Sequence, residues 1–197
     1  MKILRFKTIL LFFTVFATGI SFAQNAEEEI RAMMQERDQQ IKELVGPEGT
    51  EYTDEQRAEL KEIINGVIDF EAMAREALAE TFDTISTEQR TEFVELFSTI
   101  VSDQSLNKLD IYRAKVSYNT IESDGESARV ETLAELENVR TPVNYEMEKK
   151  NGNWVIVDME IDDVSTASSY NRQFQRIINQ RGFDTLMESL RKRASRS

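Results

Sequence analysis

The period of the apolar residues changes twice along this chain, and this change restricts the possible folds more than any other feature of the sequence. Between about residues 25 and 112, apolar side chains recur every three or four positions, which indicates amphipathic helices. From Val116 to Ile161 they alternate or run continuously, which is typical of β-strands. Helical spacing then returns and continues to Arg193. Helices, then strands, then helices again predict an α+β domain.

Residues that can cap a helix precede the segments with helical spacing. We expect helices from Asn25 to the Gly46-Pro47 pair, then from Thr53, from Asp69 and from Ser86, with a short helical segment near Leu109. Two further helices are expected over residues 166–181 and 184–193, because Gly182 is suited to ending the first of them.

Two tight turns divide the strand region into hairpins. Asp124-Gly125 separates a strand around residues 116–120 from one around 128–136. Asn151-Gly152, a pair suited to the two positive-φ positions of a type I′ turn, separates residues 143–147 from 154–161. We therefore expect an antiparallel, strongly twisted sheet of about four strands in meander order. Packed against a largely helical N-terminal half and C-terminal helices, such a sheet can enclose an apolar cavity.

The first residues have the pattern of an export signal. Lys2, Arg5 and Lys7 are followed by an apolar run over residues 9–16 and by small residues at Ser21 and Ala23. The apolar run is shorter than the ~20 residues that a membrane span needs. We therefore expect a signal peptide over residues 1–23, cleaved after Ala23, and one domain over residues 24–197.

Charge and the missing residue types exclude several functions. Removal of residues 1–23 takes away three basic residues and no acidic ones, which changes the formal net charge from −12 to −15. Such a surface repels phosphate backbones and anionic lipid, so we expect no nucleic-acid partner. The chain has no cysteine and no histidine. Disulfides, metal sites and histidine-dependent catalysis are therefore not expected.

An acidic cluster near the end of the strand region is the best candidate for catalysis. Asp158, Glu160, Asp162 and Asp163 lie close together, and paired carboxylates can perform acid–base chemistry. Regular alternation would put Asp158 and Glu160 on the same strand face as Trp154. We favour a structural interpretation, in which the cluster forms a solvated strand end and a loop that caps the next helix.

Several segments, in this order, resemble the MlaC family of toluene-tolerance, or phospholipid-binding, periplasmic proteins. Residues 69–78 resemble the family signature with phenylalanine, methionine, arginine and alanine-leucine, and residues 87–97 resemble its helix that begins with glutamine-arginine. Residues 142–145, 154–158 and 182–192 also match. Two departures are notable, because the family has glycine where this chain has Ala79 and Asp163.

The resemblance implies a non-enzymatic periplasmic carrier that is a monomer, with bound phospholipid as cargo and no cofactor. Its implied partners are an outer-membrane lipoprotein/porin complex and an inner-membrane ABC transporter complex, between which it would shuttle glycerophospholipids and so maintain outer-membrane lipid asymmetry. The residues implied to line the lipid cavity are Met73, Leu78, Phe82, Phe93, Leu96, Phe97, Ile100, Val116, Tyr118, Val130, Val143, Tyr145, Met147, Trp154, Tyr170 and Phe174.

Apolar periodicity by itself does not separate a cavity from an ordinary packed core, and for aromatic residues at this spacing a core is the usual outcome. Two alternatives to the carrier therefore stay open. One is an exported interaction module with a solid core. The other is an enzyme on a cone-shaped α+β scaffold, in which Asp158 or Glu160 would face a polar cavity.

Overall fold

The computed structural model describes residues 18–106 and 109–196, so most of the expected signal peptide lies outside the described residues. The helices before the sheet are α1 (Thr18–Val45), α2 (Asp54–Asn65), α3 (Phe70–Leu78), α4 (Glu80–Thr84), α5 (Thr87–Leu106) and the 3-10 helix η1 (Leu109–Arg113). The strands are β1 (Lys115–Ser123), β2 (Ser127–Leu136), β3 (Val139–Lys150), β4 (Asn153–Ile161) and β5 (Val164–Ser165), followed by α6 (Thr166–Arg181) and α7 (Phe183–Ala194). No helix in the described ranges is long and apolar enough to cross a membrane.

Most of the helices begin where the expected caps lie. Thr53 and Gln56 form a capping box at α2, and the carboxylate of Asp69 accepts from the N–H of Ala72 at 2.9 Å. Ser86 forms the corresponding reciprocal bonds in front of α5. The expected start at Asn25 is wrong, because α1 already begins at Thr18. With helical residues preceding it, Asn25 lies inside α1, and its side-chain amide donates to Glu29 at 2.7 Å.

The expected α+β fold and the meander order are confirmed, with one additional strand. The sheet is antiparallel in the order β1-β2-β3-β4-β5. Asn151 and Gly152 have φ angles of 52° and 84°, as a type I′ turn between β3 and β4 requires. Asp162 and Asp163 also have positive φ angles, 51° and 60°, and they turn the chain into the two-residue β5. The segment that was expected to be a solvated strand end and a loop is therefore a further tight hairpin, between β4 and β5.

An irregularity in β4 corrects the expected face of the acidic residues. Met147 pairs with Ile156, whereas Glu146 pairs with Asp158, so Val157 is an extra residue in β4. This β-bulge reverses the alternation that follows it. Asp158 therefore lies on the sheet face opposite Trp154, and the expectation that they share one face is wrong.

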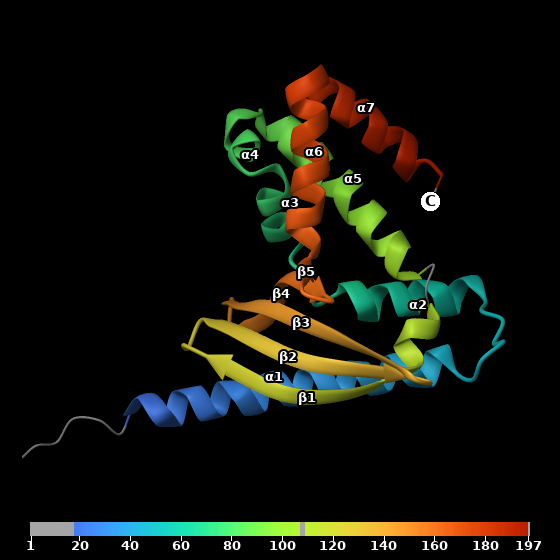
Figure 1. The fold of residues 1–197 in the computed structure, drawn as a ribbon, viewed down its shortest axis with the longest axis vertical. Coiled ribbons are helices and arrows are strands. Elements are labelled where there is room, and N and C mark those ends of the chain that lie inside the picture. Colours follow the sequence, from blue (N-terminus) through green and yellow to red (C-terminus); the bar gives the residue numbers. More distant parts are fainter. Residues whose placement is uncertain (1–17, 107–108, 197) are drawn as a thin grey trace, which may run out of the picture.

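Helix α1 runs along one face of the sheet, and helices α3 to α7 stack beyond the edge formed by β4 and β5 (Figure 1). Two main hydrophobic cores result. The sheet core joins α1 to the sheet and consists of Ala26, Ile30, Met34, Val67, Ile121, Ala128, Val130, Met147, Trp154 and Ile156. The helical core is built from α3 to α7 and includes Met73, Phe82, Phe97, Phe174 and Leu186. A smaller cluster joins α1, α2 and η1.

The segment between α2 and α3 connects the two main cores. The N–H of Ile156 donates to the carbonyl of Val67 at 2.8 Å, and the N–H of Asp69 donates to the carbonyl of Ile156 at 2.8 Å. Ile68, between these two residues, packs against both cores. This short parallel bridge holds the start of α3 against β4.

Candidate functional site

The structure places the sequence-predicted cavity residues in two separate groups. Nine of them lie in or against the helical core, namely Met73, Leu78, Phe82, Phe93, Leu96, Phe97, Ile100, Tyr170 and Phe174. The other seven lie on the sheet face that α1 covers, namely Val116, Tyr118, Val130, Val143, Tyr145, Met147 and Trp154.

The helical group is packed around stacked and perpendicular aromatic rings. The ring centroid of Phe97 lies 5.8 Å from that of Phe93 and 5.1 Å from that of Tyr170. Phe174 meets Phe93 edge-on with centroids 5.7 Å apart. These distances are typical of aromatic pairs in protein interiors. Contacts among its own side chains therefore account for the burial of this group.

The sheet group divides into covered and half-buried positions. Val130, Met147 and Trp154 are buried beneath α1, with at most 5% of their surface exposed. Further along the same face, a set of apolar side chains remains half-buried. We call this set the sheet strip, and its members are Val116, Tyr118, Ala134, Val143, Tyr145 and Met159. Ile161, which pairs with Val143, continues the strip and is 41% exposed.

Two pockets border β4. The larger, the hairpin pocket, has a volume of about 800 Å³ and lies between α1, the α2–α3 segment and the β3–β4 hairpin, where Met33, Ile68, Phe70 and Trp154 contribute to its walls. The smaller, the turn pocket, has about 320 Å³ and lies beside the β4–β5 turn, with Ile161, Val164, Tyr170 and Gln104 in its walls. Of the predicted cavity residues, Trp154 borders the hairpin pocket and Tyr170 borders the turn pocket.

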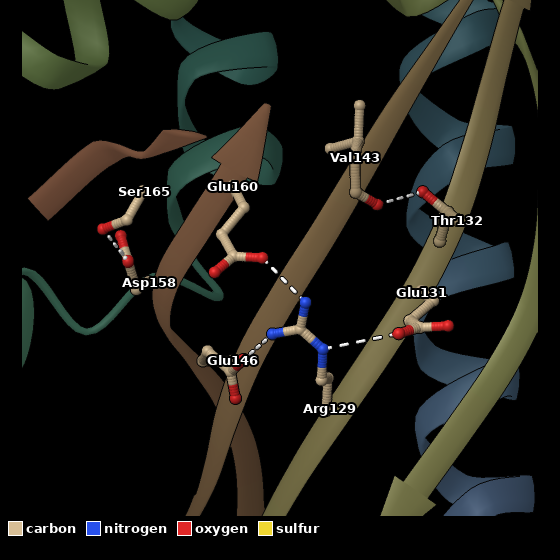
Figure 2. A network of polar contacts seen from close by, with 8 residues as sticks. All are labelled: Arg129, Glu131, Thr132, Val143, Glu146, Asp158, Glu160 and Ser165. Carbon is tan, nitrogen blue, oxygen red and sulfur yellow. Dashed lines mark hydrogen bonds and ion pairs between the residues drawn. The ribbon is translucent and has the colours of Figure 1, made fainter. Parts of the chain in front are cut away.

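The opposite face of the sheet carries a polar network centred on Arg129 (Figure 2). Its guanidinium contacts Glu131 on its own strand at 3.5 Å, Glu146 on β3, and Glu160 on β4 at 2.8 Å. The hydrogen bonds to Glu160 and Glu146 raise the pKa of Arg129 above its usual range. Arg129 thus links three neighbouring strands.

Asp158 has a structural role that the sequence suggested only in part. It caps the next helix as expected, but it is buried, with 5% of its surface exposed, where a solvated position was expected. Its carboxylate accepts from the hydroxyl of Ser165 (Figure 2). It also accepts from the N–H of Ala167, at the start of α6, at 3.0 Å. The hydroxyl of Ser165 in turn accepts from the N–H of Ser168 at 3.0 Å. Both carboxylate oxygens of Asp158 are therefore engaged at the start of α6.

One further carboxylate lies near this cap. Glu76 on α3 accepts a hydrogen bond from the hydroxyl of Ser168 at 3.2 Å. Although Glu76 is an exposed residue, partial desolvation of its carboxylate raises its pKa above the ordinary value, and the negative charge of Asp158 raises it further. Among the described residues, no group of three or more Asp, Glu, His or Cys side chains is arranged to hold a metal ion.

Some residues that line these pockets were not predicted from the sequence as site residues. Met33 of α1 lines the hairpin pocket, and Ile68 and Phe70 complete its wall. The signal for Met33 was present in the apolar stripe of the first helix, but nothing local indicates that this helix lies under the sheet. Ile68 and Phe70 lie at a helix junction, and their place beside β4 depends on pairing between distant segments.

The protein has an α+β fold with a meander sheet, and the apolar face of this sheet is partly covered. Two pockets border β4, and the nearby carboxylates are engaged in structural contacts. This arrangement is suited to non-covalent binding of an apolar ligand. The chain belongs to the MlaC family, because the family model described as "MlaC protein" matches residues 38–192. A solved structure with the same fold is the phospholipid-binding protein from Ralstonia solanacearum in complex with a phospholipid. The two chains are 17% identical and superpose with a TM-score of 0.70 over 86% of this chain and 96% of that chain. A comparison with curated proteins finds no match.

Proposed function

We propose that this protein is a phospholipid carrier that holds the acyl chains of its cargo against the sheet strip. The observation that carries the proposal is the half-buried apolar surface formed by Val116, Val143, Tyr145 and their neighbours, in a protein otherwise rich in charge. Membership of the MlaC family and the fold shared with a phospholipid-binding protein support it.

The energetics agree with binding by apolar contact. Removing a two-chain phospholipid from a bilayer exposes about thirty methylene groups, which costs on the order of 20–25 kcal/mol at about 0.8 kcal/mol each. A carrier has to replace most of that burial. Apolar side chains such as Val143 and Met159 do so without directional bonds, so we expect weak selectivity for chain length.

A carrier is favoured over an enzyme by the use that the chain makes of its acidic residues. The carboxylate of Asp158 caps α6, and that of Glu160 binds Arg129. Because both are engaged in holding the fold together, neither is aimed at a substrate. Bound phospholipid is cargo, and the proposal requires no cofactor.

In its full form, the proposal places the carrier in the periplasm as a monomer. There it would move glycerophospholipid between an outer-membrane complex and an inner-membrane ABC transporter complex. The basic and apolar leader over residues 1–23 supports export, and the acidic surface supports transient exchange with proteins over attachment to anionic lipid. Amino-terminal sequencing of the exported protein should begin at Gln24.

Native mass spectrometry of protein purified without detergent tests the proposal. We expect a mass larger than that of the chain by one phospholipid, together with phospholipid in an organic extract of the same sample. Protein that is empty in both measurements, and that stays empty after incubation with phospholipid vesicles, would contradict the carrier function.

A further inference from the structure

Two tyrosines of the sheet strip carry hydroxyl groups that no described residue engages. Tyr118 on β1 and Tyr145 on β3 lie on the same face of the sheet, half-buried against the sheet core. Within the described ranges, neither hydroxyl takes part in a hydrogen bond. Tyrosine hydroxyls in apolar surroundings usually have a partner. This pair therefore offers two donors on an otherwise apolar surface.

Elements from three sides surround these hydroxyls. Burial raises the pKa of Tyr145 well above its usual range, and the neighbouring Tyr118, Tyr112 of η1 and Asp38 of α1 raise it further. Burial and Asp38 raise the pKa of Tyr118 to about 12, while Arg31 acts in the opposite direction. The two hydroxyls thus lie in one space between the sheet, α1 and η1, and they stay protonated at neutral pH.

The charges around this space decide which acceptor suits it. A phospholipid has two kinds of acceptor near its chains, the neutral carbonyl oxygens of the acyl esters and the anionic phosphate. On the α1 side, Asp38 is paired with Lys42 at 2.7 Å and Arg31 is paired with Glu27 at 3.0 Å. Because each of these two cations is already bound to a carboxylate, neither offers an unpaired positive charge to a phosphate, whereas a neutral carbonyl needs only a hydroxyl donor. The surroundings therefore favour the ester carbonyls.

We propose that Tyr118 and Tyr145 donate hydrogen bonds to the ester carbonyl oxygens of a bound diacyl phospholipid. The carrier then distinguishes ester-linked lipids from lipids of the same length whose chains are attached by ethers. The inference rests on the proposed carrier function, and it adds a recognition element at the junction of headgroup and chains.

A competition between two synthetic lipids tests this inference. Detergent-free protein is incubated with vesicles that contain equal amounts of diester and diether phosphatidylcholine, with the same headgroup and chain length, and occupancy is measured by native mass spectrometry. At about 0.5–1.5 kcal/mol for each of the two hydrogen bonds, the wild-type protein should prefer the diester lipid roughly fivefold to 150-fold. The double variant Tyr118→Phe/Tyr145→Phe should show a ratio near one, and each single variant an intermediate ratio.

The matched control is Tyr52→Phe, which removes a tyrosine hydroxyl that donates to the carbonyl of Val45, in a different cluster. It should keep the wild-type preference. Equal binding of both lipids by the wild-type protein, or an unchanged preference in the double variant, would overturn the inference while leaving the carrier function in place. Wild-type protein that takes up neither lipid would overturn both. Circular dichroism verifies that each variant is folded.

Discussion

The carboxylate of Asp158 accepts a hydrogen bond from the backbone N–H of Ala167 at 3.0 Å, so a side chain of the sheet holds the first turn of α6. The hydroxyl of Ser165 donates to the same carboxylate and in turn accepts from Ser168. N–H groups at the start of a helix have no partner within the helix, and here they are satisfied by residues of β4 and β5. The junction between sheet and helices therefore depends on this buried carboxylate.

Removal of that carboxylate should destabilise the protein measurably. We expect Asp158→Ala to lower the free energy of unfolding by about 1–3 kcal/mol, because it leaves buried donors without an acceptor. Urea unfolding followed by circular dichroism measures the change. Glu59→Ala, at an exposed position of α2, is the control and should change stability by no more than about 0.5 kcal/mol. Equal stability of the two variants would contradict the capping role.

A glycine at position 79 should stabilise the protein. Ala79, between α3 and α4, has φ 49° and ψ −134°, a conformation that glycine adopts far more readily than alanine. The MlaC signature has glycine at this position. We expect Ala79→Gly to raise the unfolding free energy by about 1 kcal/mol. Ala58→Gly, in the middle of α2, should lower it by about the same amount. A loss of stability in both variants would show that Ala79 is not strained.

Position 163 offers a second test of the same kind, within the β4–β5 turn. Asp163 has φ 60°, where a β-branched residue is strongly disfavoured. Asp163→Val should reduce the unfolding free energy by about 1–2 kcal/mol, whereas Asp163→Gly should not reduce it. Glu122→Val, at an exposed position within β1, controls for the added apolar surface. If Asp163→Val is as stable as this control, the turn does not need its left-handed conformation.

Stability should depend on pH through Glu76. Partial desolvation and the charge of Asp158 raise the folded pKa of Glu76 above 4.5. Its contribution to stability is therefore complete below that pH and is lost as the pH rises through the folded pKa. Glu76→Gln removes this loss, so the urea midpoint should exceed that of the wild type at pH 7 and match it near pH 4. Glu62→Gln, exposed on α2, should show no such difference between the two pH values.

The two groups of predicted cavity residues should respond differently to substitution. Phe97 has no exposed surface and packs between Phe93 and Tyr170, so Phe97→Ala should cost about 3–5 kcal/mol of stability. Val143 lies on the half-buried strip, and Val143→Asp should reduce phospholipid occupancy in native mass spectrometry with a smaller loss of stability. Unchanged occupancy in folded Val143→Asp protein would place the lipid elsewhere.

Local signals made much of this fold predictable. Thr53 with Gln56 and Asn151 with Gly152 specify their own structures through short-range hydrogen bonds and backbone conformation, and both appear as expected. The tight turn at Asp162 and Asp163 was harder to recognise, because aspartate occupies positions where glycine is the usual signal.

The features that could not be predicted depend on distant pairing. The bulge at Val157 arises from the register between β3 and β4, and it moves Asp158 to the other face of the sheet. Phe97 and Tyr145 are both aromatic residues at regular spacing, yet they lie in different parts of the molecule. The path of α1 and the parallel bridge at Ile68 determine which core a side chain joins. Neither feature can be recognised from the local sequence.

The division of the interior into two cores has a consequence for the dynamics of the protein. Proteins open locally in cooperative units that follow such clusters, at free energies below that of global unfolding. The sheet core and the helical core meet at Ile68 and at the short bridge beside it. We therefore expect the amides of the α1 side to exchange with solvent as one unit while those of α5 and α6 stay protected. Such partial opening would give a phospholipid held against the sheet strip a route of exit that leaves the aromatic core folded.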